Sequence, residues 1–147
     1  MQLGQEKSKV LFVCTGNSCR SQMAEGWAQH LLGNQLEVYS AGLKAQGINP
    51  HAVYVMQEAG IDISKQESNS LDSFSDQHFD YVITVCDHAR QHCPSFPGTT
   101  HLLHRRFDDP PFLAEAEETE VGALNHYRRV RDEIKDWVLE NLGQTIR

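Results

Sequence analysis

The chain has 147 residues, 39% of them hydrophobic, which suits one domain with a continuous core and excludes global disorder. Its 13 Lys and Arg residues against 20 Asp and Glu residues give a net charge of −7, which disfavours nucleic acid and anionic membranes as partners. We therefore predict one domain over residues 1–147 that holds any anionic ligand by local geometry.

The start of the chain lacks the charged-then-apolar pattern of a secretory signal, and no apolar stretch approaches the roughly 20 residues that cross a bilayer. We expect the protein in the cytoplasm and, because no pairing stripe is evident, as a monomer. In a reducing compartment cysteines are more often reactive, metal-binding or buried than joined in structural disulfides. The four cysteines are therefore the main functional candidates: Cys14, Cys19, Cys86 and Cys93.

The first half of the chain alternates predicted strands and helices. The apolar run at residues 9–13 predicts a buried strand, and the apolar spacing over residues 23–31 predicts a helix that Gly33 ends as a left-handed cap. Residues 36–40 form a second predicted strand. An Asn-Pro pair opens the next helix, over residues 49–60.

The second half continues the alternation. Residues 81–85 predict a third buried strand, residues 100–103 a weaker fourth, and the apolar stripe over residues 124–138 a long C-terminal helix. The acidic run at residues 115–120 is interpreted as a solvated loop. This order predicts an α/β three-layer sandwich, with a four-stranded parallel sheet and helices on both faces. In such a fold, ligands bind at the carboxyl ends of the strands.

A candidate anion-binding loop follows the first strand. Five residues separate Cys14 from Arg20, which opens the helix, and Gly16 and Asn17 both tolerate positive φ. Such a loop can turn its backbone N–H groups inward around a tetrahedral oxyanion, while the arginine grips two oxygens. The same positive field favours the thiolate form of Cys14, the form that attacks, and Ser21 could donate a hydrogen bond to it.

Two further cysteines follow the third strand. If the strands at 9–13 and 81–85 are neighbours, their ends lie about 5 Å apart, and Cys14 and Cys86 approach disulfide distance. Cys93 lies seven residues beyond Cys86. Seven residues of helix span about 10.5 Å, more than the roughly 7 Å that a disulfide bridges, so a bond between these two requires the segment to loop or unwind.

Other roles stay open for these residues. The segment after the third strand has the side chains of a metal site, namely Cys86, His88, His92 and Cys93. Cys86 and Cys93 could also be merely buried thiols. Packed or solvated roles are expected for His101 and His104.

The loop segment VCTGNSCRSQMAEG resembles the phosphate-binding loop of the low-molecular-weight tyrosine phosphatases, specifically of their arsenate reductase branch. The resemblance covers nearly the whole chain and implies the four-stranded phosphatase-like fold, with Cys19 as a structural residue. The matching segments are residues 13–26, 39–42, 60–64, 107–110 and 128–134. The substrate-binding residues that it implies are Thr15, Gly16, Asn17, Ser18, Cys19, Arg20 and Ser21.

The resemblance also implies a mechanism for arsenic detoxification. Cys14 would attack arsenate with Asp109 as the acid. Cys86 would attack Cys14 and release arsenite, and Cys93 would then displace Cys14, leaving a Cys86–Cys93 disulfide for thioredoxin to reduce. No tightly bound cofactor is implied, although a monovalent cation near Asn17 and Glu25 is an option, as is glutaredoxin as the electron donor.

Asp108 competes with Asp109 for the role of the acid. Pro110 restricts the residue before it to extended backbone, and the family pattern also favours the aspartate before the proline. Asp108 is then expected to support the loop or to lie in a surface turn.

The chain departs from the family pattern on both sides of this acid. His104-Arg105-Arg106 stands where these reductases usually carry aromatic and glycine residues, which bears on local packing and anion attraction. Pro111-Phe112 follows where the phosphatases usually place tyrosines, so a phosphotyrosine pocket is disfavoured. The alternatives are a phosphatase acting on phosphotyrosine or aryl phosphates, and a redox-sensing or metal-binding regulator.

Overall fold

The computed structural model of the protein describes residues 7–96, 98–99 and 101–145, with side chains up to residue 143. The strands are β1 (Ser8–Cys14), β2 (Leu36–Gly42), β3 (Tyr81–Thr84) and β4 (His101–His104). The helices are α1 (Arg20–Leu32), α2 (Pro50–Glu58), α3 (Asp87–His92), α4 (Pro110–Ala114) and α5 (Glu120–Thr145), with a 3-10 turn, η1 (Leu71–Phe74).

The strands form one parallel sheet in the order β2-β1-β3-β4. All four predicted strands are confirmed, although β1 and β2 run on to Cys14 and Gly42, β3 ends at Thr84, and residue 100 of the predicted fourth strand lies outside the described residues. Val13 pairs with Thr84, so the carboxyl ends of β1 and β3 are adjacent. The residues that follow these two strands therefore meet at one edge of the sheet.

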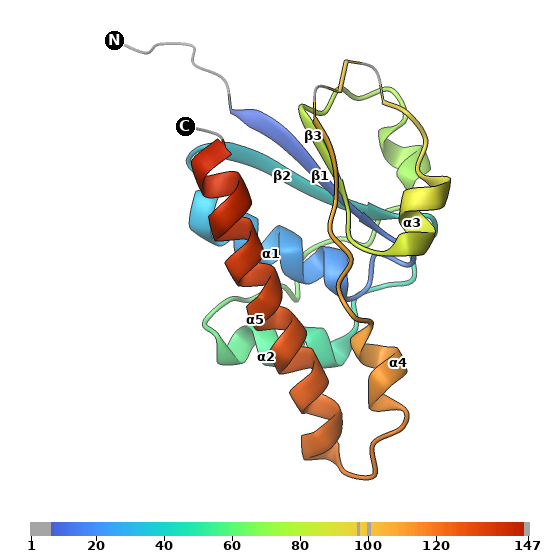
Figure 1. Cartoon of the computed structure of the whole chain (residues 1–147), viewed down its shortest axis with the longest axis vertical. Helices are drawn as coiled ribbons and strands as arrows, with labels where there is room; N and C mark the ends of the chain where they lie inside the picture. The colour runs from blue at the N-terminus through green and yellow to red at the C-terminus, as the bar shows by residue number, and fades with distance from the viewer. Residues whose placement is uncertain (1–6, 97, 100, 146–147) are drawn as a thin grey trace.

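Helices cover both faces of the sheet (Figure 1). The chain leaves β1 toward one edge and β3 toward the other, and right-handed crossovers then put α1 and α3 on opposite faces. Helix α5 packs on α1, and α2 packs against both of them. This arrangement confirms the three-layer α/β fold.

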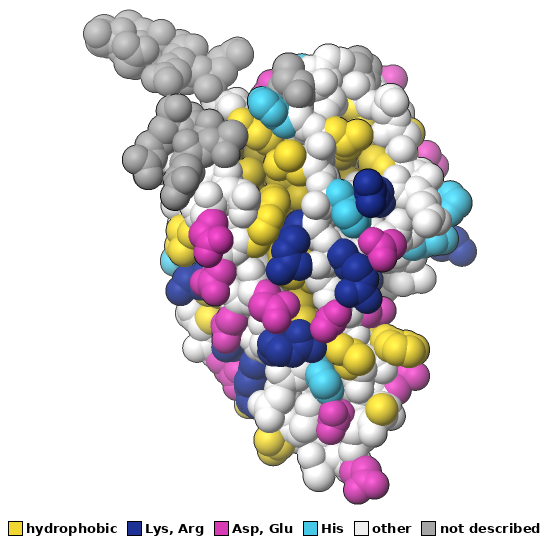
Figure 2. All heavy atoms as spheres, viewed as in Figure 1, with side chains coloured by type: hydrophobic (Ala, Val, Ile, Leu, Met, Phe, Trp, Pro, Cys, Tyr) yellow, Lys and Arg dark blue, Asp and Glu magenta, His cyan; other side chains and the backbone are white. Residues whose placement is uncertain are grey.

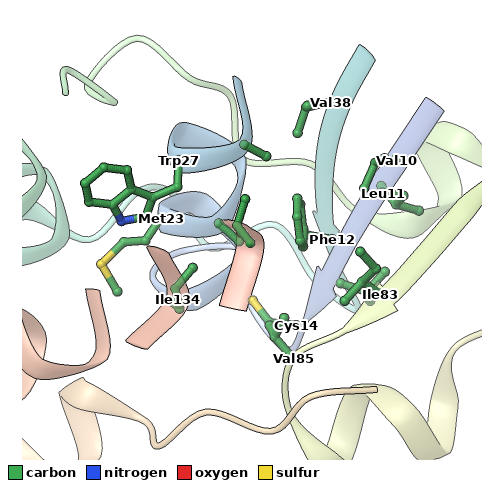
Figure 3. Packing of buried hydrophobic residues seen from close by; sticks show 14 of the residues in the cluster. Val10, Leu11, Phe12, Cys14, Met23, Trp27, Val38, Ile83, Val85 and Ile134 are labelled. Carbon is green, nitrogen blue, oxygen red and sulfur yellow. The ribbon is translucent and has the colours of Figure 1, made fainter. Parts of the chain in front are cut away.

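The core surrounds β1, whose residues Val10, Leu11, Phe12 and Val13 are fully buried because helices cover the sheet on both sides. Figure 3 shows their neighbours from α1, β3 and α5. Trp27 of α1 donates its indole N–H to the carbonyl of Arg131 in α5, at 3.1 Å. The predicted stripe of α5 is confirmed by its buried residues Leu124, Tyr127, Val130, Ile134 and Val138. Within the described residues, no helix is long and apolar enough to span a membrane.

One sequence-based expectation about a helix end is wrong, and one short helix was not predicted. Gly33 has right-handed φ and ψ of −60° and −18°, and glycine is needed there because a Cβ would lie 2.4 Å from the carbonyl oxygen of Gln29. The left-handed glycine is Gly60, at φ 87°, just after α2. The short helix α4 was not expected; Pro110 occupies its first turn, where a missing N–H costs nothing. The acidic run is exposed, as predicted, and its last residue begins α5.

Candidate active site

The loop between β1 and α1 surrounds a cavity of about 260 Å³ at the carboxyl edge of the sheet. Helix α1 begins at Arg20, as predicted, so its N-terminus faces the same cavity. The lining residues are Cys14, Thr15, Gly16, Ser18, Cys19, Arg20, Gln46, Asp109 and Pro111. Most of the predicted substrate-binding residues are thus brought together, while Asn17 and Ser21 lie behind them.

Asn17 shapes the loop from the inside. It has a φ of 49° and is fully buried. Its amide nitrogen donates to the hydroxyls of Ser21, at 2.8 Å, and Ser40, at 2.9 Å, and its amide oxygen accepts the backbone N–H of Asn69 at 2.7 Å. These bonds hold the left-handed turn, which confirms the conformational prediction for Asn17.

The glycines of the site serve close approach instead of positive φ. A Cβ on Gly16 would lie 2.1 Å from the side-chain oxygen of Gln46. A Cβ on Gly42, at the end of β2, would lie 2.6 Å from the backbone nitrogen of Asn17. Of the two residues expected to tolerate positive φ, Asn17 adopts it and Gly16 does not. Gly42 belongs to a matching segment, 39–42, but its contact with the loop was not foreseen.

The Cys14 sulfur lies 2.8 Å from the Ser21 hydroxyl oxygen, and both residues are buried. The Asn17 amide nitrogen can only donate, so the Ser21 oxygen accepts that bond and keeps its own hydrogen available for the sulfur. The predicted contact between Ser21 and Cys14 is confirmed.

Arg20 joins the loop to the segment that carries Asp109. One guanidinium nitrogen donates to the carbonyl of Phe107 at 3.0 Å, and another lies 3.8 Å from the Asp109 carboxylate. Asp109 has the extended backbone predicted from the proline that follows, with φ −93° and ψ 101°. Its side chain makes no capping hydrogen bond with α4, so the carboxyl group stays available at the cavity.

Asp108, the competitor for the acid role, is bound elsewhere. Arg106 donates to it at 3.0 Å, and Arg129 of α5 lies 3.1 Å from its other oxygen. The hydrogen bond from Arg106, helped by Arg129, lowers the pKa of Asp108. A carboxylate held ionised by two arginines is a poor proton donor, which favours Asp109 as the acid.

Cys86 lies beside the anion loop. It lies two residues after the end of β3, and its sulfur is 3.3 Å from the Thr15 hydroxyl oxygen. The same sulfur accepts the Ala89 N–H at 3.4 Å as the N-cap of α3. Figure 3 shows Cys14 close to Val85, the residue before Cys86. The predicted adjacency of the two strand ends is therefore confirmed.

Cys93 lies at the other end of the same helix. It is the C-cap of α3 and half-buried, and burial raises its pKa. All four cysteines are free thiols. Since α3 is helical between Cys86 and Cys93, a bond between these two requires this helix to change shape.

The remaining candidates have structural surroundings. Cys19 is buried, which raises its pKa and keeps it a neutral thiol. The rings of His88 and His92 lie 4.6 Å apart on exposed positions, but no three His, Cys, Asp or Glu residues in the described ranges are placed to hold a metal ion. His101 stacks on Tyr81 at 4.4 Å, which confirms its packed role.

The unusual arginines before Phe107 do not line the cavity. Arg105 lies over the Phe107 ring at 4.3 Å, and Arg106 pairs with Asp87 and Asp108. Their effect is therefore on packing and on the neighbouring acidic residues rather than on direct anion contact.

Sequence reasoning missed three residues around the loop. Gln46 and Pro111 line the cavity, and Ser40 links Asn17 to Glu25, whose carboxylate accepts the Ser40 hydroxyl at 2.5 Å. Burial raises the pKa of Glu25 to about 7. Ser40 and Gln46 flank the end of β2, and the signal that could have found them is the pairing of β2 with β1.

Comparison with known proteins agrees with this geometry. The chain is 51% identical over 128 residues to an arsenate reductase of Halalkalibacterium halodurans, covering 87% of this chain and 90% of that one. A solved arsenate reductase in a phosphate-binding state superposes with a TM-score of 0.76 at 35% identity, covering 95% of this chain and 99% of the other. A thioredoxin-dependent arsenate reductase of Corynebacterium glutamicum superposes with a TM-score of 0.66 at 29% identity, covering 97% and 66%.

The family model described as low molecular weight phosphotyrosine protein phosphatase matches residues 9–147. These include the anion loop, the segment 107–110 that carries Asp109, called the acid segment below, and the thiols of Cys86 and Cys93. The chain therefore belongs to the low molecular weight phosphotyrosine protein phosphatase family.

Proposed function

We propose that this protein reduces arsenate to arsenite through a relay of three cysteines and thereby serves arsenic detoxification. One observation carries the proposal: the Cys86 sulfur touches Thr15 of the anion loop, at 3.3 Å. Hydrolysis of a phosphate ester needs a single thiol in the loop, whereas reduction needs a second thiol that can reach the first. The similarity to arsenate reductases supports the same choice.

The first step joins sulfur to arsenic. Arsenate binds among the loop N–H groups at the N-terminus of α1, with Arg20 gripping its oxygens. Cys14 Sγ attacks the arsenic, a sulfur–arsenic bond forms, and one arsenic–oxygen bond breaks. Asp109 protonates the departing oxygen, which leaves as water. Ser21 holds the attacking sulfur in place.

The second step reduces arsenic. The Cys86 thiolate attacks Cys14 Sγ, and the sulfur–arsenic bond breaks with its electron pair staying on arsenic. Arsenic passes from As(V) to As(III) and leaves as arsenite, while the Cys14–Cys86 disulfide forms. The Cys93 thiolate then attacks Cys86, which forms the Cys86–Cys93 disulfide and releases the Cys14 thiolate for another round.

We propose thioredoxin as the electron donor, whose two thiols are oxidised as the Cys86–Cys93 disulfide is reduced. The similarity to a thioredoxin-dependent enzyme supports this choice. Cys93 also lines a cavity of about 480 Å³ next to β4, outside the anion loop, where a protein reductant can approach the disulfide.

The test measures arsenite formation with thioredoxin, thioredoxin reductase and NADPH. Cys14→Ser and Cys86→Ser should form no arsenite over multiple turnovers. Cys93→Ser should complete one round and trap a Cys14–Cys86 disulfide, visible by mass spectrometry. His92→Ala, an exposed neighbour of Cys93, is the matched control and should keep turnover. Full steady-state activity in Cys86→Ser would contradict the relay, and replacing thioredoxin with glutaredoxin tests the donor.

The runner-up is a phosphatase that uses the same loop through a cysteinyl-phosphate. The family membership favours it, but Gln46 and Pro111 line the cavity beside the loop, and Phe112 is 69% exposed and does not line the cavity. We therefore expect slow hydrolysis of p-nitrophenyl phosphate as a side reaction. Hydrolysis faster than arsenate reduction would reverse the order of the two candidates.

We further propose that the chain acts as a single-domain monomer in the cytoplasm without a tightly bound cofactor. We propose a monovalent cation beside Glu25, because this half-buried carboxylate and the Ser40 hydroxyl supply oxygen atoms along one cavity. A potassium ion there would replace the proton that Glu25 otherwise binds near neutral pH. Light scattering tests the monomer. Comparison of turnover in potassium chloride and in tetramethylammonium chloride tests the cation.

A further inference from the structure

Helix α3, which connects Cys86 to Cys93, has little support from the core. It spans six residues, and Ala89 is its buried side chain. Isolated helices shorter than about 12 residues are marginal in water, so the helical form of α3 depends on contacts at its ends. One such contact is the Cys86 cap itself.

The second contact is ionic and holds Asp87, the first residue of α3. His104 Nε2 lies 3.1 Å from one carboxylate oxygen of Asp87, and Arg106 Nε lies 3.3 Å from the other. We call these three residues the Asp87 clamp. Figure 2 shows basic, acidic and histidine side chains next to one another on the face that carries the end of β4. A carboxylate at a helix N-terminus also interacts favourably with the helix dipole.

Both partners of Asp87 are anchored. The Nδ1 atom of His104 lies 2.8 Å from the Thr84 hydroxyl of β3. Because a carboxylate can only accept, His104 Nε2 donates to Asp87. Arg106 is held by Asp108, which pairs in turn with Arg129 of α5. The clamp thus ties the first turn of α3 to the sheet and to the acid segment.

Formation of the Cys86–Cys93 disulfide must disturb this clamp. The two cysteines cap opposite ends of α3, and bridging them requires the helix to unwind. Asp87 is the residue after Cys86, so its carboxylate leaves its partners when the first turn opens. The ion pairs belong to the dithiol form, and opening the first turn of α3 would break them.

We propose that Arg106 is a positioning residue that acts through Asp87, with His104, to hold α3 helical and to set the equilibrium between the Cys86/Cys93 dithiol and its disulfide. This inference rests on the proposed relay. The clamp makes the disulfide a better oxidant, because reduction restores the ion pairs. It thereby favours transfer of electrons from the reductant into the protein.

The test uses the full chain with Cys14→Ser and Cys19→Ser, which leaves Cys86 and Cys93, in glutathione redox buffers. One oxidised glutathione converts the dithiol to the disulfide and yields two reduced glutathione molecules. Arg106→Ala should increase the equilibrium constant for disulfide formation about two- to fivefold, the range that one exposed ion pair supplies. Arg106→Lys should restore part of the difference.

The matched control is Arg129→Ala, which makes the same charge change in the same network without touching α3. It should leave the equilibrium constant unchanged. Asp87→Asn should shift the constant in the direction of Arg106→Ala, and the double variant should shift it by less than the product of the two. A merely structural role for Arg106 would change thermal unfolding without moving this constant.

Hydrogen exchange gives an independent measurement. In the reduced protein, Arg106→Ala should speed amide exchange at Ala89 and Arg90, the first amides that bond back to Cys86, and leave β1 unchanged. Equal equilibrium constants for Arg106→Ala and Arg129→Ala would overturn the clamp while leaving the relay intact. If the chain with only Cys14→Ser and Cys19→Ser forms no Cys86–Cys93 disulfide at any glutathione ratio, the proposed relay is wrong. The proposed role of the Asp87 clamp is then wrong as well.

Discussion

The two regions that meet at the carboxyl edge of the sheet are built differently. The anion loop is held by buried hydrogen bonds between neutral groups, centred on Asn17. The segment from Cys86 to Cys93 is a short, exposed helix held at its ends by a thiol cap and ion pairs. A loop that binds a charged transition state gains from rigidity, whereas a disulfide relay needs a segment that can open.

The largest expected effect concerns the acid segment that joins the two regions. Asp109→Asn removes the proton donor and should lower turnover by about 10²- to 10⁴-fold. Asp108→Asn, the matched control, removes a carboxylate that two arginines already occupy and should cost much less. Single-turnover arsenite release measures both. Equal losses would mean that the segment acts through its fold and that neither carboxyl group is the acid.

The next effect tests the rigidity of the anion loop. Asn17→Ala removes the hydrogen bonds that Asn17 makes with the Ser21 and Ser40 hydroxyls and with the Asn69 N–H, and it puts alanine at positive φ. We expect the free energy of unfolding to fall by about 3 kcal/mol. Urea denaturation measures this loss, and inhibition by phosphate should weaken in parallel. Asn34→Ala, at an exposed loop position, is the control.

A smaller effect is a pH dependence that belongs to the loop region alone. Burial raises the pKa of Glu25 from its ordinary 4.5 to about 7, so the folded state binds a proton that the unfolded state has lost between these values. Stability should therefore fall as pH rises from about 4.5 to about 7, by at most about 3 kcal/mol. Urea denaturation in tetramethylammonium buffers should show this slope, and Glu25→Gln should flatten it.

The smallest effect separates the two regions by salt. Raising sodium chloride from 0.05 to about 0.5 M shortens the range of charge interactions, so exchange at Ala89 should speed up by about two- to fivefold. The buried neutral bonds around Asn17 should protect their amides equally at both salt concentrations. Salt-independent exchange at Ala89 would show that its thiol cap, and not charge, holds α3.

Much of the fold was predictable because its signals are local. Apolar runs identified the four strands, and the Asn-Pro pair correctly started α2. Gly33 was misjudged because a glycine can be required either by positive φ or by close packing. Close packing, the reason here, depends on the path of the neighbouring backbone, which the local sequence does not show. Helix α4 was missed because five residues are too few to show a helical period.

By itself, the sequence determined the anion loop. Cys14, the turn at Asn17 and Arg20 lie within one strand–loop–helix unit, and their spacing specifies the geometry of the loop. Tertiary structure alone decided which groups from elsewhere in the chain contact that loop. Thr15 and Cys86 are 71 positions apart in the chain, Asn17 and Asn69 are 52 apart, and Asp87 meets Arg106 through the pairing of β3 with β4. Such contacts depend on strand order, a global property that local residue patterns do not encode.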